Sequence, residues 1–281
     1  MTTIATNPTN APAVTVAPSV EMEKMPFFSQ VLMMTRRSLL TNIRVPAAVL
    51  PGMIISLFFL LIYDSTLGGA SNFLPGLAGK SYLGFILPLS VVSAALSGSG
   101  IAGQSIVRDI ERGYFDKLML TPINRVALVL GPMLAGAVLL AIQTTLVVGL
   151  AVVMGLRPET GPLGLLVVIL FALLLGVGFG GFTVGVALLT GNAAATQGAG
   201  FLFFPLSFLT ATFVPVALLS GWIKVAAQLN PITYILEGQR EILLNGWNAQ
   251  PILGGLVAIL LLGAVMIAFA MWALRTRTRR K

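Results

Sequence analysis

Long apolar runs alternate with short polar connections along this chain, and the pattern predicts most of its elements. Six runs are long enough to cross ~30 Å of hydrocarbon as helices that rise about 1.5 Å per residue. They lie near residues 45–63, 82–104, 126–154, 163–189, 197–219 and 251–274. The pattern therefore predicts an all-α, polytopic membrane protein with six transmembrane helices.

The segment before the first run, residues 26–44, is amphipathic. Apolar side chains recur there at helical spacing, beside a basic side formed by Arg36, Arg37 and Arg44. This pattern predicts an N-terminal helix in the membrane interface, with its cations facing lipid headgroups. A plain basic flank to the first span is the alternative interpretation.

The segment before the last run, residues 220–250, is neither continuous enough for a span nor polar enough for a free loop. Trp222 marks a first short helix, and Asn230 followed by Pro231 predicts the start of a second one that runs through Leu244. We expect two short extracellular helices at this position. At the other end of the chain, residues 1–25 are rich in Thr, Pro, Ala and Val, which predicts a disordered tail ahead of a transmembrane domain over 26–281.

Composition agrees with a membrane protein. The chain is 57% hydrophobic and 9% charged, whereas a soluble domain carries about 25% charged residues. The net charge of +8 would suggest a nucleic-acid partner in a soluble domain, but in a membrane protein it reflects cytoplasmic Lys and Arg. We therefore expect membrane lipids and no nucleic acid as partners.

The distribution of Lys and Arg predicts the orientation. If the N-terminus lies inside, the outer side carries only four of the 17 basic residues, namely Lys80, Arg157, Lys224 and Arg240. Cytoplasmic connections carry the excess of Lys and Arg in membrane proteins. The distribution therefore predicts a multi-pass membrane protein with both termini in the cytoplasm, and a cytoplasmic segment 108–125.

Few chemical groups for catalysis are present. The chain has no Cys and no His, which excludes thiolate nucleophiles, disulfides, His-based zinc sites and His general bases. Two G-x-G-x-x-G matches begin at Gly98 and Gly176, but both lie within predicted spans, so they indicate close helix packing. No charged residue lies deep in a predicted span, where ion-driven carriers need a relay. We expect a non-catalytic chain without a cofactor or metal of its own.

Residues 108–125 are the most charged segment of the chain. We predict a short cytoplasmic helix there, weakened at Gly113, after which Thr121 caps and Pro122 begins the next helix. Four apolar side chains would share one face of this helix: Ile106, Ile110, Tyr114 and Leu118. A docking surface for a partner is one interpretation, and a solvated connector is the other.

Two sets of residues match a known pattern. The first set is Arg108 to Gly113, Asp116 to Leu118, Thr121, Pro122 and Arg125; the second is Phe204 to Leu209, Phe213 to Pro215, Trp222, Asn230 to Tyr234, Glu237 and Arg240. Together they closely resemble the type-2 ABC exporter permeases, and among these the daunorubicin-resistance (drug and lipid export) branch.

The resemblance implies roles for both sets. The ATPase-coupling helix would include Arg108, Asp109, Glu111, Arg112, Gly113, Asp116, Lys117, Leu118, Thr121, Pro122 and Arg125. An extracellular gate would include Phe213, Pro215, Trp222, Asn230, Pro231, Tyr234, Glu237 and Arg240. The implied partners are two copies of a cytoplasmic ABC ATPase, which would bind ATP and Mg²⁺, and a second permease, either a second copy of this chain or a related one.

The favoured hypothesis is therefore the membrane subunit of an ABC exporter for an amphipathic drug or lipid-like substrate. An exporter of a polysaccharide or glycolipid, a secondary transporter driven by an ion gradient, and a membrane scaffold without transport activity are the alternatives.

Overall fold

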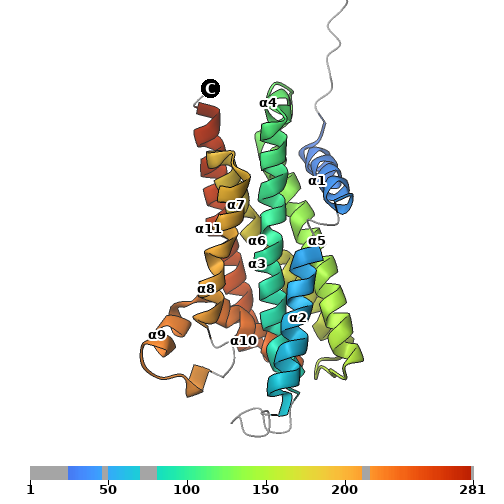
Figure 1. Ribbon diagram of the computed structural model, residues 1–281, viewed down its shortest axis with the longest axis vertical. Helices are drawn as coiled ribbons and strands as arrows, with labels where there is room; N and C mark the ends of the chain where they lie inside the picture. The colour runs from blue at the N-terminus through green and yellow to red at the C-terminus, as the bar shows by residue number, and fades with distance from the viewer. Residues whose placement is uncertain (1–24, 46–49, 70–80, 211–215, 280–281) are drawn as a thin grey trace, which may run out of the picture.

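The computed structural model describes residues 25–45, 50–69, 81–210 and 216–279, and within these ranges it contains helices and no strand (Figure 1). The elements are α1 (Phe27–Ile43), α2 (Leu50–Leu67), α3 (Tyr82–Glu111), α4 (Tyr114–Met119), α5 (Arg125–Val153), α6 (Gly161–Thr190), α7 (Ala193–Phe201), α8 (Phe203–Phe208), η3 (Val216–Leu218), α9 (Gly221–Leu229), α10 (Pro231–Leu244) and α11 (Ala249–Arg279). The all-α prediction is confirmed. The predicted tail, apart from Met25, lies outside the described residues.

The long helices form a bundle with α3 at its centre. α3 packs against α2, α5, α6 and α7, while α11 packs against α6 and α10. Figure 1 shows α4 and the C-terminus at one end of this bundle, and α9 and α10 at the opposite end. The interface helix α1, which the sequence predicts, lies obliquely beside α5 near the α4 end.

Within the described residues, four helices are long and apolar enough to cross a membrane: α3, α5, α6 and α11. α2 is apolar but shorter, with 18 residues. The chain is thus a multi-pass membrane protein, while the full count of six spans stays a prediction.

The segment of the predicted fifth span, 197–219, is divided into shorter helices within the described residues, so this span stays a prediction. α7 ends at Phe201, a turn follows at Leu202, and the six-residue α8 begins at Phe203. Pro205 supplies the physical reason, because it has no N–H for the carbonyl of Phe201 and its ring crowds that carbonyl. Residues 211–215, which follow α8, lie outside the described part of the chain.

Glycines allow the central helices to approach closely, as the two G-x-G-x-x-G matches predict. A Cβ on Gly103 of α3 would lie 2.7 Å from the Thr183 carbonyl oxygen on α6, and one on Gly176 of α6 would lie 2.9 Å from the Cα of Ala137 on α5. Real Cβ atoms do not tolerate such distances to backbone atoms. These glycines are therefore packing positions, and the prediction of close helix packing is confirmed.

Candidate functional site

The charged segment 108–125 forms a corner at one end of the bundle, but it is not one helix as predicted. α3 continues to Glu111, so Arg108 and Asp109 belong to the long central helix, and α4 begins only at Tyr114. Gly113 separates the two with a φ of +65°, a left-handed conformation that glycine adopts without steric cost. The break turns α4 against the end of α3 and places Tyr114 at the surface, away from the predicted apolar face.

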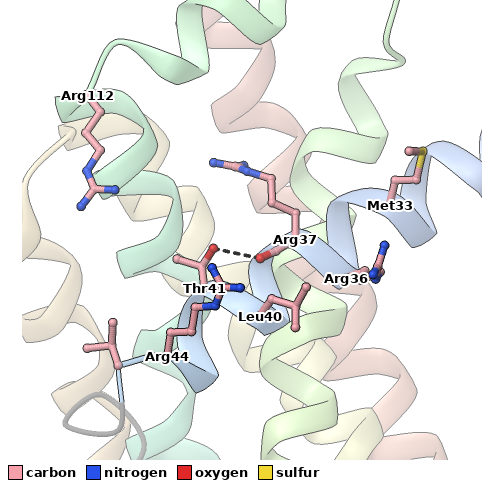
Figure 2. A pocket seen from close by; sticks show the side chains of 8 residues that line it. Met33, Arg36, Arg37, Leu40, Thr41, Arg44 and Arg112 are labelled. Atoms are coloured by element: carbon pink, nitrogen blue, oxygen red, sulfur yellow. Dashed lines mark hydrogen bonds between the residues drawn. The ribbon is translucent and has the colours of Figure 1, made fainter.

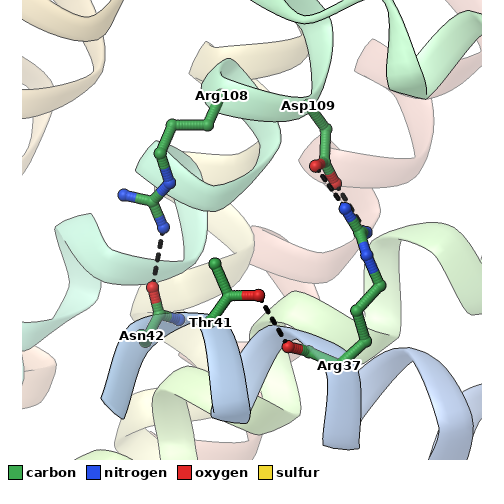
Figure 3. A network of polar contacts seen from close by, with 5 residues as sticks. All are labelled: Arg37, Thr41, Asn42, Arg108 and Asp109. Atoms are coloured by element: carbon green, nitrogen blue, oxygen red, sulfur yellow. Dashed lines mark hydrogen bonds and ion pairs between the residues drawn. The ribbon is translucent and has the colours of Figure 1, made fainter. Parts of the chain in front are cut away.

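An ion pair ties this corner to α1. The guanidinium of Arg37 donates two hydrogen bonds to the carboxylate of Asp109, at 2.8 and 2.6 Å (Figure 3). It also lies 4.2 Å from the ring centroid of Tyr114. The hydrogen bonds to Asp109 raise the pKa of Arg37 above its ordinary value. Asp109 is buried, so the pair satisfies a carboxylate that would otherwise be desolvated without a partner.

Further polar contacts join α1 to the same region. Arg108 donates to the side-chain oxygen of the buried Asn42 at 2.7 Å (Figure 3), and the side-chain oxygen of Gln30 accepts the backbone N–H of Asn124 at 2.8 Å. α1 is therefore fastened both to the end of α3 and to the start of α5. A displacement of the corner would be transmitted to α1 and to two of the long helices.

The start of α5 differs from the prediction in its cap. Asn124, not Thr121, is the N-cap residue, and its side chain accepts the N–H of Val126 at 2.9 Å. The hydroxyl of Thr121 instead donates to the Leu118 carbonyl at 2.6 Å. Pro122 lies in the bend before the helix, and Arg125 is its exposed first residue. Either Thr or Asn can cap a helix, and the longer turn places Asn124 at the end.

α4 has a buried side and an exposed side. Phe115 and Leu118 are buried, and the guanidinium of Arg277 on α11 lies 5.7 Å from the Phe115 ring centroid. Asp116 and Lys117 are exposed, and 88% of Leu120, just after α4, is accessible. The short helix is thus anchored by two apolar side chains and presents a mixed charged and apolar surface at the tip of the bundle.

Arg112 is not the cation that pairs with Asp109, although the two residues are three positions apart. Asp109 bonds to Arg37 of α1, and Arg112 is exposed in the turn between α3 and α4, as is Glu111 at the end of α3. Helical spacing allows an Asp109–Arg112 pair, but α1 lies beside the end of α3 and supplies the cation instead.

The described residues of the predicted extracellular gate belong to α9, to α10 and to the N-cap of α10. Both helices lie at the opposite end of the bundle (Figure 1). Asn230 caps α10 by accepting the N–H of Ile232 at 3.0 Å, and Pro231 is the first helical residue, as predicted. The side-chain amide of Asn230 also donates to the carbonyls of Leu206 and Leu209, at 2.7 and 3.1 Å. These bonds hold α10 against the end of α8.

Arg240 is the least expected member of this set, because it is buried. Its Nε donates to the carbonyl of Phe85 on α3 at 2.9 Å, and its guanidinium lies 3.6 Å from the centroid of the Phe85 ring. Stacking on an aromatic face and a hydrogen bond to a carbonyl stabilise a cation away from water. The structure thus connects α10 directly to the central helix.

The other members of the set are more accessible. Trp222 is exposed on α9, Tyr234 donates its hydroxyl to the Gln228 carbonyl at 2.8 Å, and Glu237 is half-buried. Phe213 and Pro215 lie outside the described residues.

Comparison with known families decides the identity. The sequence pattern of the ABC-2 type transporter family matches residues 29–244, which include both the corner and the α9–α10 region. The chain belongs to the ABC-2 type transporter family. It is therefore a transmembrane permease subunit of an ABC transporter, as the two residue sets in the sequence indicated.

Curated relatives of this permease carry related names. It is 26% identical over 231 residues to the probable doxorubicin resistance ABC transporter permease protein DrrC of Mycobacterium tuberculosis, covering 82% of this chain and 83% of that protein. It is 26% identical over 224 residues to the daunorubicin resistance ABC transporter permease protein DrrB1 of Streptomyces coeruleorubidus, covering 76% and 77%. A putative transport permease, ycf38, of Cyanophora paradoxa is 25% identical over 75% of this chain and 73% of its own length.

Several residues that shape the permease's corner were not among the predicted site residues: Arg37, Asn42, Phe115, Asn124 and Arg277. The sequence contained a signal for Arg37 alone. A carboxylate at the end of an apolar span needs a cation as its partner, and the sequence of α1 contains several basic residues. The other contacts depend on how the helices pack.

Proposed function

We propose that this permease exports an amphipathic drug or lipid-like substrate from the cytoplasm or the inner leaflet, powered by a separate ATPase that docks on α4. The observation that carries the proposal is the exposed surface of Asp116, Lys117 and Leu120, on a short helix anchored by Phe115 and Leu118. Chemical energy must come from a partner, because no P-loop motif occurs in the sequence. The names of the DrrC and DrrB1 relatives support a drug as the substrate.

Membership of the ABC-2 family supports a proposed assembly. Two copies of the ATPase, each holding ATP and Mg²⁺, would act on two permeases, which are either two copies of this chain or this chain and a related one. ATP-driven closure of the ATPases would push on the α3–α4 corner. At the other end of the bundle, α9 and α10 would form the extracellular gate, and neither ATP nor a metal would bind to this chain itself.

The proposed orientation places α4 and both termini in the cytoplasm of a bacterium, and labelling tests it. The chain has no cysteine, so the single-cysteine variants Leu120→Cys and Val153→Cys report on opposite ends of the bundle. In intact cells a membrane-impermeant maleimide should label Val153→Cys only, and after permeabilisation it should label both. Labelling of Leu120→Cys in intact cells would show that the orientation is reversed.

If the ATPase docks on α4, Leu120→Asp should weaken its association by at least about tenfold, which corresponds to ~1.4 kcal/mol of binding free energy. The reason is that an exposed apolar side chain at the centre of an interface contributes strongly to binding. The measurement is copurification and titration of a candidate ABC ATPase with the full-length chain, with drug-dependent ATP hydrolysis as a second readout. Val153→Asp, which changes an equally exposed residue at the far end of α5, is the matched control. Equal affinity of the two variants would refute docking on α4.

A further inference from the structure

A basic groove lies between α1 and the turn that joins α3 to α4. Its volume is about 530 Å³, and its lining residues are Met33, Arg36, Arg37, Leu40, Thr41, Arg44, Val45 and Arg112 (Figure 2). Arg112 comes from the α3–α4 turn, and the others come from α1 and the two residues after it. Figure 2 shows the side chains of Arg37, Arg44 and Arg112 directed toward the space between the two elements.

The charge of this groove is not balanced by the chain. Of the four lining arginines, Arg37 has the carboxylate of Asp109 as its partner. Arg36, Arg44 and Arg112 are exposed, and the structure records no ion pair for any of them within the ranges it describes. Cations gathered in one groove repel one another, so a bound anion would lower the energy of the site.

The position of α1 indicates where this anion would come from. One face of α1 is buried against the bundle through Val31, Met34, Ser38 and Asn42. A second face leaves Phe28 and Leu32 exposed, by 83% and 69% respectively. A helix that exposes large apolar side chains beside arginines is suited to the boundary between headgroups and acyl chains.

The groove occupies the third face of α1, and its lining is amphipathic. Met33, Leu40 and Val45 supply apolar surface beside the arginines. A free phosphate ion would contact the guanidinium groups and leave this apolar surface exposed to water. A phospholipid would use both, since its headgroup is anionic and its acyl chains begin a few ångströms away.

We propose that the groove binds an anionic phospholipid, with Arg44 and Arg112 on either side of the headgroup phosphate, Arg36 at the rim, and Met33 and Leu40 against the first methylenes of the chains. Guanidinium groups bind phosphate oxygens in bidentate geometry, which favours arginine in this role. Because Arg44 follows α1 and Arg112 belongs to the α3–α4 turn, the lipid would join the interface helix to the corner. This site is separate from the α4 surface proposed for the ATPase, so it can be tested on the permease alone.

The experiment measures binding of two tail-labelled fluorescent lipids, phosphatidylglycerol and phosphatidylcholine with the same acyl chains, to the purified full-length chain in neutral detergent. The wild type should bind phosphatidylglycerol at least about tenfold more tightly, since each basic residue near an anionic lipid adds roughly 1 kcal/mol of attraction. The double variant Arg44→Gln/Arg112→Gln should lose this preference. Arg44→Lys/Arg112→Lys, which keeps the charge, should retain most of it.

The matched control is Arg275→Gln/Arg279→Gln, which removes two exposed arginines from the same end of the bundle but outside the groove. It should bind phosphatidylglycerol like the wild type, and the melting temperature of each variant shows that it is folded. Equal binding of both lipids by the wild type, or an equal loss in the control, would overturn the proposal. So would displacement of the labelled lipid by millimolar inorganic phosphate, which would identify a phosphate site. Unchanged lipid binding with weakened ATPase association in the groove variant would instead identify a protein contact.

Discussion

Replacing Asp109 by Asn should destabilise the permease by about 2 kcal/mol and uncouple ATP hydrolysis from transport. This loss of stability lies between the loss expected for breaking an exposed ion pair and that for breaking a buried one. The reason is that Asp109 is largely buried, whereas Arg37 is about one-third accessible. The amide cannot balance the charge of Arg37, which stays protonated. We therefore expect a fall of several degrees in the melting temperature of the purified protein. Transport of the proposed substrate should fall more than ATP hydrolysis by the ATPase, since one of the contacts that fasten α1 to the corner is lost.

Two further variants separate charge from packing at this position. Glu111→Gln removes an exposed carboxylate from the same end of α3 and should change stability by less than about 0.5 kcal/mol. The exchange Arg37→Asp/Asp109→Arg should recover part of the stability that either single change loses, because the pair is re-formed in the opposite sense. A melting temperature of Asp109→Asn equal to that of the wild type would contradict the role given to the ion pair.

Replacing Gly103 by Ala should destabilise the bundle by about 3 kcal/mol, the scale of a severe core substitution. The added Cβ would lie 2.7 Å from the Thr183 carbonyl oxygen and 2.5 Å from the Cγ2 of Thr196. The first neighbour is backbone of α6, so relief requires α3 and α6 to separate along their contact. The hydroxyl of Thr183 also donates to the Ser99 carbonyl of α3 at 2.6 Å, and this bond would be strained by the same movement. Thermal unfolding and the yield of folded protein report the effect.

Gly100→Ala is the matched control for this substitution. Gly100 lies three residues earlier on α3, in the same G-x-G-x-x-G match, and a Cβ there would meet no atom within 4 Å. Alanine should therefore leave stability unchanged or raise it by up to about 1 kcal/mol, because it favours the helix over the unfolded chain. Equal effects of the two substitutions would show that close packing at Gly103 is not what requires glycine.

α3 is a physical connection between the two ends of the permease. α3 carries Phe85, which binds Arg240 of α10, near one end and Asp109, which binds Arg37 of α1, near the other. Its 30 residues correspond to about 45 Å of helix. We expect a movement of the corner to reach the α9–α10 region through α3, with both contacts as the points of transmission.

Local patterns in the sequence determined much of this protein. The apolar runs predicted the long helices, Asn230 and Pro231 predicted the start of α10, and the basic side of residues 26–44 predicted α1. These features depend on a few neighbouring residues, whose spacing and capping chemistry follow from helix geometry alone. The two residue sets that indicated the ABC-2 family are likewise contiguous or nearly so.

The contacts that hold the corner in place were decided only by the tertiary structure. Arg37 and Asp109 are 72 residues apart, and Arg240 and Phe85 are 155 apart. Helical spacing also allows Arg112 as the partner of Asp109, and the packing of α1 beside the end of α3 brings Arg37 there instead. A charged side chain at the end of a span requires a partner of opposite charge, and this requirement can be predicted from the sequence. Which of several cations meets it depends on how the helices pack around α3.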